Sequence, residues 1–178
     1  RIDRIERVTF EDAGRAVPTD ASDALEFVSV GMAVPEHEVR VVDAKEQPLG
    51  ERQQGTIQFR GPSSFKGYFR RPDVTAEVQR ADGWVDTGDL GYIGEGELFI
   101  TGRAKDLIIK GGRNYYPHEF EAAAATVPGI RQGCIAAFSV PDPSSGTERI
   151  VVVAETREKD GTSREILQAQ VLEAVTAA

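Results

Sequence analysis

Short stretches of alternating apolar and polar residues, separated by turns rich in glycine and proline, dominate the middle of this chain. Residues 39–43 and 55–61 alternate in this way, as half-buried strands do. Residues 84–93 and 97–101 predict a hairpin around the turn at 94–96. Consecutive hairpins with few helices between them predict a small antiparallel barrel or half-barrel.

The pattern changes after residue 102, where helices and strands alternate. We expect, in chain order, a strand at 107–109, a helix at 117–127, strands at 134–140 and 150–155, and a final helix. Thr162 and Glu165 have capping-box spacing at the start of that last helix. This order describes an α+β lobe, with a boundary at 103–106. Residues 1–30 show little sustained period, so we expect them to be loop-rich, with a short strand near 25–30.

Composition limits the classes of function. The chain has 178 residues and a net charge of −8, which disfavours broad binding to a nucleic-acid backbone. No segment is long and apolar enough to span a bilayer, and the N-terminus has no signal-peptide pattern. Cys134 is the single cysteine, which fits a reducing, cytoplasmic location, and two distant histidines predict no intrinsic metal site. The chain does not begin with methionine, so we expect it to be an excised piece.

Two motifs carry the chemistry: residues 83–90 (GWVDTGDL) and residues 102–106 (GRAKD). The first places Asp89 just past a tight Thr-Gly turn, and the second places Arg103 and Lys105 near the start of another strand. A carboxylate can accept two hydrogen bonds from a cis-diol such as ribose, and an arginine fork suits ribose or phosphate oxygens. The pairing indicates a nucleotide site. Alternatively, Asp89 caps a turn, Arg103 forms an ordinary ion pair and Lys105 is solvated.

These motifs, in this order, resemble the adenylate-forming ligase superfamily, which includes acyl-CoA synthetases, luciferases and peptide-synthetase adenylation domains. Residues 112–121 (GRNYYPHEFE) are most similar to the fatty-acyl-AMP ligases, as are residues 14–18 (GRAVP) and 27–31 (FVSVG). The resemblance covers nearly the whole chain, although the chain covers only the C-terminal portion of the family.

The resemblance implies a fold and a set of roles. Residues 1–30 would be an insertion-like tail of the large domain, residues 31–102 its distorted antiparallel β-barrel subdomain, and residues 103–178 an incomplete α+β C-terminal lobe. Asp89 and Arg103 would bind the ribose of the nucleotide. Lys105 would be the hinge about which the C-terminal lobe turns. No catalytic residue and no metal ligand fall within the chain.

The resemblance also implies the reaction of the parent enzyme. It would use ATP, with Mg²⁺, to convert a fatty acid to an acyl-adenylate for transfer to the phosphopantetheine thiol of an acyl-carrier protein. Many CoA-using relatives have arginine where this chain has Asn114, which disfavours CoA as acceptor. An acyl-CoA synthetase and a degenerate, non-catalytic docking module are the alternatives. The phosphate loop and the C-terminal lysine of the family are absent here, so we expect the fragment alone to be inactive, without bound nucleotide or metal.

Overall fold

The computed structural model describes residues 1–111, 113–142 and 147–177. The chain forms two compact units, Arg1–Lys105 and Asp106–Ala178. Both units combine strands with helices, so the predicted α+β class is confirmed. Gly112, which begins one of the motifs in the sequence, lies outside the described residues.

The first unit opens with more regular structure than its sequence predicted. Strand β1 (Ile2–Ile5) and helix α1 (Arg7–Ala13) precede strand β2 (Leu25–Val28), which falls in the range where a strand was expected. β1 and β2 pair antiparallel. Phe10 of α1 and Phe27 of β2 are buried in ring contact, with centroids 5.4 Å apart. The scattered apolar residues of this segment therefore contribute to the core.

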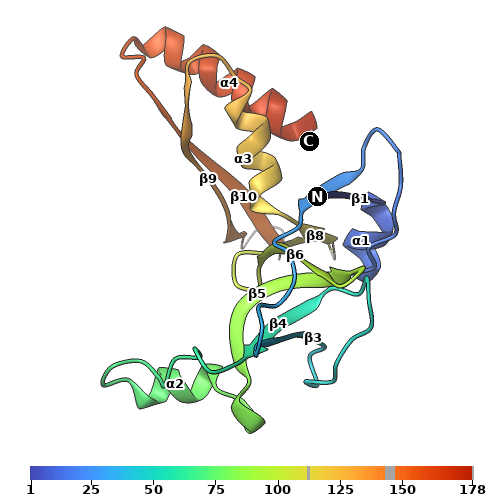
Figure 1. The fold of residues 1–178 in the computed structure, drawn as a ribbon. Helices are drawn as coiled ribbons and strands as arrows, with labels where there is room; N and C mark the ends of the chain where they lie inside the picture. The colour runs from blue at the N-terminus through green and yellow to red at the C-terminus, as the bar shows by residue number, and fades with distance from the viewer. Residues whose placement is uncertain (112, 143–146, 178) are drawn as a thin grey trace. The chain divides into compact units, whose positions relative to one another are not determined.

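A four-stranded antiparallel sheet follows, in the order β3-β4-β5-β6 (Figure 1). Its strands are β3 (Glu38–Val42), β4 (Gly55–Arg60), β5 (Val85–Gly94) and β6 (Glu97–Arg103). Helix α2 (Pro72–Val78) and the short 3-10 turn η1 (Ala81–Gly83) lie between β4 and β5 in the chain. The predicted hairpin is present as β5 and β6.

This sheet stays open, so the predicted barrel is not confirmed: in the described residues the outer strands β3 and β6 do not pair. Other segments occupy their free edges. Along β6, the N–H of Val30 donates to the carbonyl of Leu98 at 2.9 Å. The N–H of Leu98 donates to the carbonyl of Gly31 at 2.8 Å. The loop after β3 folds back, with the N–H of Leu49 donating to the carbonyl of Val41 at 2.8 Å. Because these segments pair with backbone N–H and C=O groups at the edges of β3 and β6, the two strands do not have to pair with each other to satisfy those groups.

The described residues of the second unit form two antiparallel strand pairs and two helices. Its elements are β7 (Ile108–Lys110), β8 (Arg113–Tyr115), α3 (Pro117–Ala125), β9 (Ile130–Asp142), β10 (Thr147–Thr156) and α4 (Gly161–Ala177). β7 pairs with β8, and β9 pairs with β10. Helix α3 packs against β9 and against α4 (Figure 1). The sequence predicted these elements except β8, which is too short to show a period.

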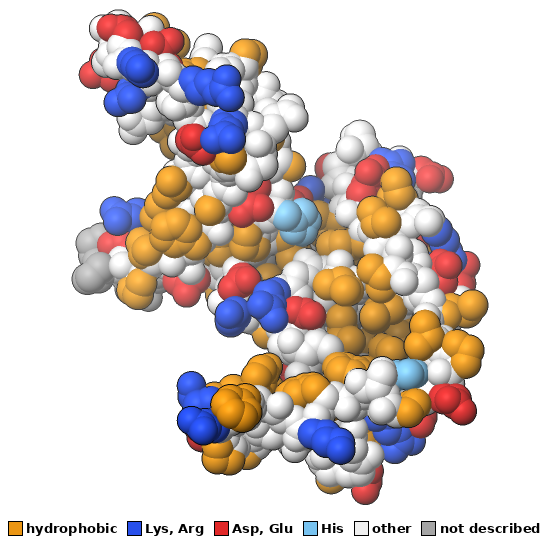
Figure 2. All heavy atoms as spheres, turned by 60° about the vertical axis from the view of Figure 1, so that its left-hand side comes forward, with side chains coloured by type: hydrophobic (Ala, Val, Ile, Leu, Met, Phe, Trp, Pro, Cys, Tyr) orange, Lys and Arg blue, Asp and Glu red, His pale blue; other side chains and the backbone are white. Residues whose placement is uncertain are grey.

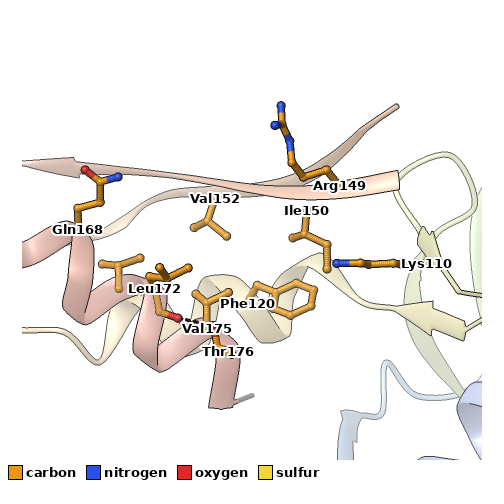
Figure 3. Close-up of a pocket in the computed structure, with 10 residues that line it drawn as sticks. Lys110, Phe120, Arg149, Ile150, Val152, Gln168, Leu172, Val175 and Thr176 are labelled. Carbon is orange, nitrogen blue, oxygen red and sulfur yellow. Dashed lines mark hydrogen bonds between the residues drawn. The ribbon is translucent and has the colours of Figure 1, made fainter. Parts of the chain in front are cut away.

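The core of the second unit is left partly uncovered. A groove of about 430 Å³ runs between β10 and the two helices, over apolar side chains that include Phe120, Ile150 and Val175. Figure 3 shows Lys110 and Arg149 at one end of this groove and Gln168 at the other. Leu172 of α4 lines the groove with 67% of its surface exposed.

Large apolar side chains are also exposed on the first unit. Val28, Val30, Met32 and Val34 follow one another at every second position, and each is more than half exposed. Figure 2 shows hydrophobic groups lying at the surface between charged ones. Of the helices in the described ranges, none has the length and hydropathy that crossing a membrane requires.

Candidate nucleotide site

The Thr-Gly-Asp motif leaves the sheet as a bulge in β5. In the ladder between β4 and β5, Gln58 is opposite Asp86 and Thr56 is opposite Leu90. Ile57 alone therefore faces the three residues Thr87–Gly88–Asp89. Bulges re-aim side chains and are common beside functional sites. Here the bulge interrupts the pairing of β5 with β4, while Asp89 stays in register with Arg103 of β6.

Four hydrogen bonds fix the bulge. The hydroxyl of Thr87 donates to the carbonyl of Ile57 and accepts from the N–H of Asp89, both at 3.0 Å. The N–H of Gly88 donates to Oδ1 of Asp86 at 2.8 Å. The carbonyl of Gly88 accepts from the N–H of Ala104 at 3.0 Å. Gly88 has φ +74°, which explains why glycine occupies this position.

Asp89 and Arg103 meet, as the nucleotide-site hypothesis required. They lie opposite each other in the β5–β6 ladder, and Nε of Arg103 donates to Oδ1 of Asp89 at 2.9 Å. The ion pair named as the simpler alternative is therefore present. It leaves Oδ2 of Asp89 without a hydrogen bond from any described residue, so the same carboxylate can still accept one from a ligand. The side chains are 29% and 53% exposed, and both can reach a ligand in solvent.

Lys105 lies two residues beyond Arg103, in the turn at 104–106 that follows β6. Its side chain is exposed, and it is the last residue of the first unit. Its position at the end of a compact unit is compatible with a hinge.

A polar network beside the bulge was missed from the sequence. Arg80, which follows α2, donates from Nη2 to Oδ2 of Asp86 at 2.8 Å and from Nε to Oε1 of Glu46. Glu46 also accepts from the buried amide of Gln58 at 3.2 Å. Partial burial raises the pKa of the Glu46 carboxyl, but the hydrogen bonds from Arg80 and Gln58 outweigh it, so this pKa lies below its ordinary value.

One sequence signal could have pointed to part of this network. Asp86-Thr87-Gly88 has the form of an Asx-turn, in which an aspartate accepts from the backbone two residues on. The partner Arg80 could not be inferred, because it reaches Asp86 across η1. Within the described residues there is no cluster of three or more His, Cys, Asp and Glu side chains that could hold a metal ion.

Comparisons with known proteins agree on one class of enzyme. No protein-family profile matches the chain. It is 39% identical over 171 residues to the long-chain-fatty-acid–AMP ligase FadD26 of Mycobacterium tuberculosis, covering 87% of this chain and 28% of that protein. It is 44% identical over 115 residues to the sulfoacetate–CoA ligase of Cupriavidus necator, covering 64% of this chain and 22% of that protein.

A solved structure supports the same grouping. It comes from a study of fatty acyl-adenylate ligases from E. coli and L. pneumophila and superimposes with a TM-score of 0.87 at 35% identity. The match covers 99% of this chain and 32% of that one. The chain thus spans less than a third of the length of each of these relatives.

Proposed function

Because this chain belongs to the adenylate-forming ligases over most of its length, we propose that it is part of a fatty-acyl-AMP ligase. The long-chain-fatty-acid–AMP ligase among its relatives and the high structural similarity to fatty acyl-adenylate ligases support this choice of branch. The proposal extends to the domain assignment: residues 1–102 would belong to the large domain and residues 103–178 to the small C-terminal lobe.

The parent enzyme would run two steps. A fatty carboxylate oxygen attacks the α-phosphorus of ATP, the bond to the bridging oxygen breaks, and pyrophosphate leaves. The thiol of a carrier-protein phosphopantetheine then attacks the acyl carbonyl, loses its proton, and displaces AMP to give a thioester. No covalent enzyme intermediate is required, so catalysis would rest on positioning and electrostatics. We assign no Mg²⁺ ligand to this chain.

The geometry of Asp89 and Arg103 is the observation that carries the proposal. With Arg103 on Oδ1, the free Oδ2 of Asp89 can accept from a ribose hydroxyl, while the unused guanidinium nitrogens of Arg103 can donate to sugar or phosphate oxygens. These two residues would hold the nucleotide in both half-reactions. Lys105 would allow the C-terminal lobe to change orientation between them.

The test uses the intact ligase that we propose contains this chain. Given ATP and a fatty acid, it should accumulate acyl-AMP, followed by mass spectrometry, and transfer the acyl group faster to carrier protein than to CoA. Asp89→Ala should raise the KM for ATP by about thirtyfold, the equivalent of about 2 kcal/mol for a lost hydrogen bond to a charged group, and leave the KM for fatty acid unchanged. An unchanged KM for ATP would remove the ribose role.

An acyl-CoA synthetase is the second candidate, and the 44% identity to a CoA ligase favours it. Efficient acyl-CoA formation from free CoA would select this candidate. Failure to form acyl-AMP under any condition would instead support the non-catalytic docking module.

A further inference from the structure

We propose that Arg80 is a positioning residue for Asp89, acting through Asp86 and the Gly88 amide. The proposal rests on the nucleotide role of Asp89 proposed above. Arg80 precedes the first motif (83–90) by three residues, lies outside both motifs and would not touch the nucleotide. Its contacts nevertheless set the conformation of the bulge on which Asp89 is carried.

The first step is the link from Asp86 to the bulge. The two carboxylate oxygens of Asp86 have separate partners: Oδ1 accepts from the N–H of Gly88 and Oδ2 accepts from Arg80, both at 2.8 Å. The Asp86 side chain is 18% exposed. With Oδ2 held by Arg80, the carboxylate plane is fixed and Oδ1 stays aimed at Gly88. An unanchored carboxylate could rotate away from the amide and toward solvent.

The second step is the anchoring of Arg80 itself. Its guanidinium has three acceptors from three segments: the Glu46 carboxylate in the loop after β3, the Glu77 carbonyl in α2, and Asp86 in β5. Glu46 is held in turn by Gln58, a fully buried residue whose side-chain oxygen accepts two hydrogen bonds from Arg40, at 2.9 and 2.7 Å. The planar fork of an arginine suits such multiple contacts, whereas a lysine presents a single point charge.

The third step is the effect on Asp89. Gly88 is in the left-handed region at φ +74°, and apart from its chain neighbours no atom of the described residues lies within 4 Å of the position where a Cβ would stand. No side chain in the described ranges packs on that face of Gly88, and the hydrogen bonds of its N–H and carbonyl restrain it. Loss of the Asp86 bond leaves the bulge with those of Thr87 and Ala104, so Asp89 would sample more positions and meet the ribose less often.

The kinetic test measures the KM for ATP in the intact ligase. Arg80→Ala should raise it about threefold to tenfold, less than Asp89→Ala because the bulge keeps the hydrogen bonds of Thr87 and Ala104, with the KM for fatty acid unchanged. Arg80→Lys should give an intermediate value, because the ammonium can reach Asp86 but cannot serve all three acceptors. Arg4→Ala is the control: Arg4 pairs with Glu26 in the same unit at 3.1 Å, away from the bulge, and its loss should leave both constants unchanged.

A double-mutant cycle separates positioning from general destabilisation. If Arg80 acts through Asp89, Arg80→Ala should change the KM for ATP less than about twofold once Asp89→Ala is present. Full additivity of the two substitutions would overturn the proposal, as would equal effects of Arg80→Ala on the KM for ATP and for fatty acid.

A structural readout distinguishes failure of this proposal from failure of the nucleotide role. In the 178-residue chain, Arg80→Ala should accelerate hydrogen exchange at the Gly88 amide by about tenfold, measured by NMR, and Arg4→Ala should not. Unchanged exchange would overturn the link between Arg80 and the bulge even if Asp89 binds ribose. Accelerated exchange with no effect of Asp89→Ala on ATP use would confirm the link and overturn the nucleotide role.

Discussion

At the residue scale, Asp3 shows how the first unit tolerates a charge in its core. It is only 6% exposed, and its Oδ2 accepts from the hydroxyl of Tyr92 at 2.7 Å and from Arg52 at 3.0 Å. Burial, together with the hydrogen bond to Asp3, raises the pKa of Tyr92 above its ordinary value, so the phenol stays a neutral donor. Because Tyr92 also stacks on Phe99, with centroids 5.0 Å apart, the charge is tied to the aromatic core.

We expect Tyr92→Phe to lower the free energy of unfolding by about 2 kcal/mol, because it removes one of the two hydrogen bonds to a buried carboxylate while keeping the ring. Urea denaturation of the 178-residue chain measures this. Tyr68→Phe is the matched control, since Tyr68 is 50% exposed and should change stability by less than about 0.5 kcal/mol. Equal effects of the two substitutions would show that the Tyr92 hydroxyl contributes nothing to stability.

Sequence reasoning at this scale succeeded where both partners belonged to recognisable motifs. Asp89 and Arg103 each belong to a local pattern, and hairpin register brings them together. Arg80 lies outside both patterns, and its meeting with Glu46 depends on how two loops fold over the sheet. Contacts of that kind are set by tertiary structure, and no local spacing in the sequence predicts them.

At the scale of elements, the hairpins and helices were predictable because hydrophobic period and turn residues are local signals. The open sheet was not. Its closure depended on which other segments could pair with its edges. Residues 30 and 31 bond to β6 although the expected strand was placed only near 25–30, and the loop at 43–49, which has no strand-like period, folds back along β3. Short elements such as β8 were missed for the same reason, since three residues show no period.

The start of α4 is a further correction. The sequence suggested Thr162 as the N-terminal cap, but the helix begins at Gly161, and the residue before it, Asp160, accepts from the N–H of Ser163 at 2.8 Å.

We expect Asp160→Ala to lower the thermal midpoint of the 178-residue chain, because it leaves a helix N–H without its acceptor. Thr162→Ala is the matched control and should change the midpoint little. A larger loss of thermal midpoint for Thr162→Ala than for Asp160→Ala would instead indicate that Thr162 caps the helix.

The same cap predicts a pH dependence. Hydrogen bonds from Ser163 lower the pKa of Asp160 below its ordinary value of 3.8. A carboxyl whose pKa is lower in the folded state contributes stability above its unfolded pKa and loses that contribution as pH falls through the folded pKa. The difference in thermal midpoint between wild type and Asp160→Ala should therefore be full at pH 7 and shrink below about pH 4. A constant difference down to pH 2 would argue against an ionised cap.

At the scale of the whole molecule, both units expose apolar surface that a core would normally cover. The stripe at Val28, Val30, Met32 and Val34 and the groove beside Leu172 are examples. Exposed patches of this kind commonly mark contact surfaces. They support the proposal that the chain functions within a longer ligase, as does the fact that it spans less than a third of the length of the relatives described above.

The proposed hinge gives the last prediction. Proline fixes φ, so Lys105→Pro in the intact ligase should restrict the backbone change that the two half-reactions require and impair one of them more than about tenfold. ATP–pyrophosphate exchange reports the first step, and thioester formation from supplied acyl-AMP reports the second. Lys105→Ala is the control, because it removes the exposed side chain and keeps the backbone free, and both steps should proceed. The N–H of Lys105 donates no backbone hydrogen bond to a described residue, so proline there would act on conformation and not on a lost contact. Normal rates for both steps in the proline variant would mean that Lys105 is not the pivot.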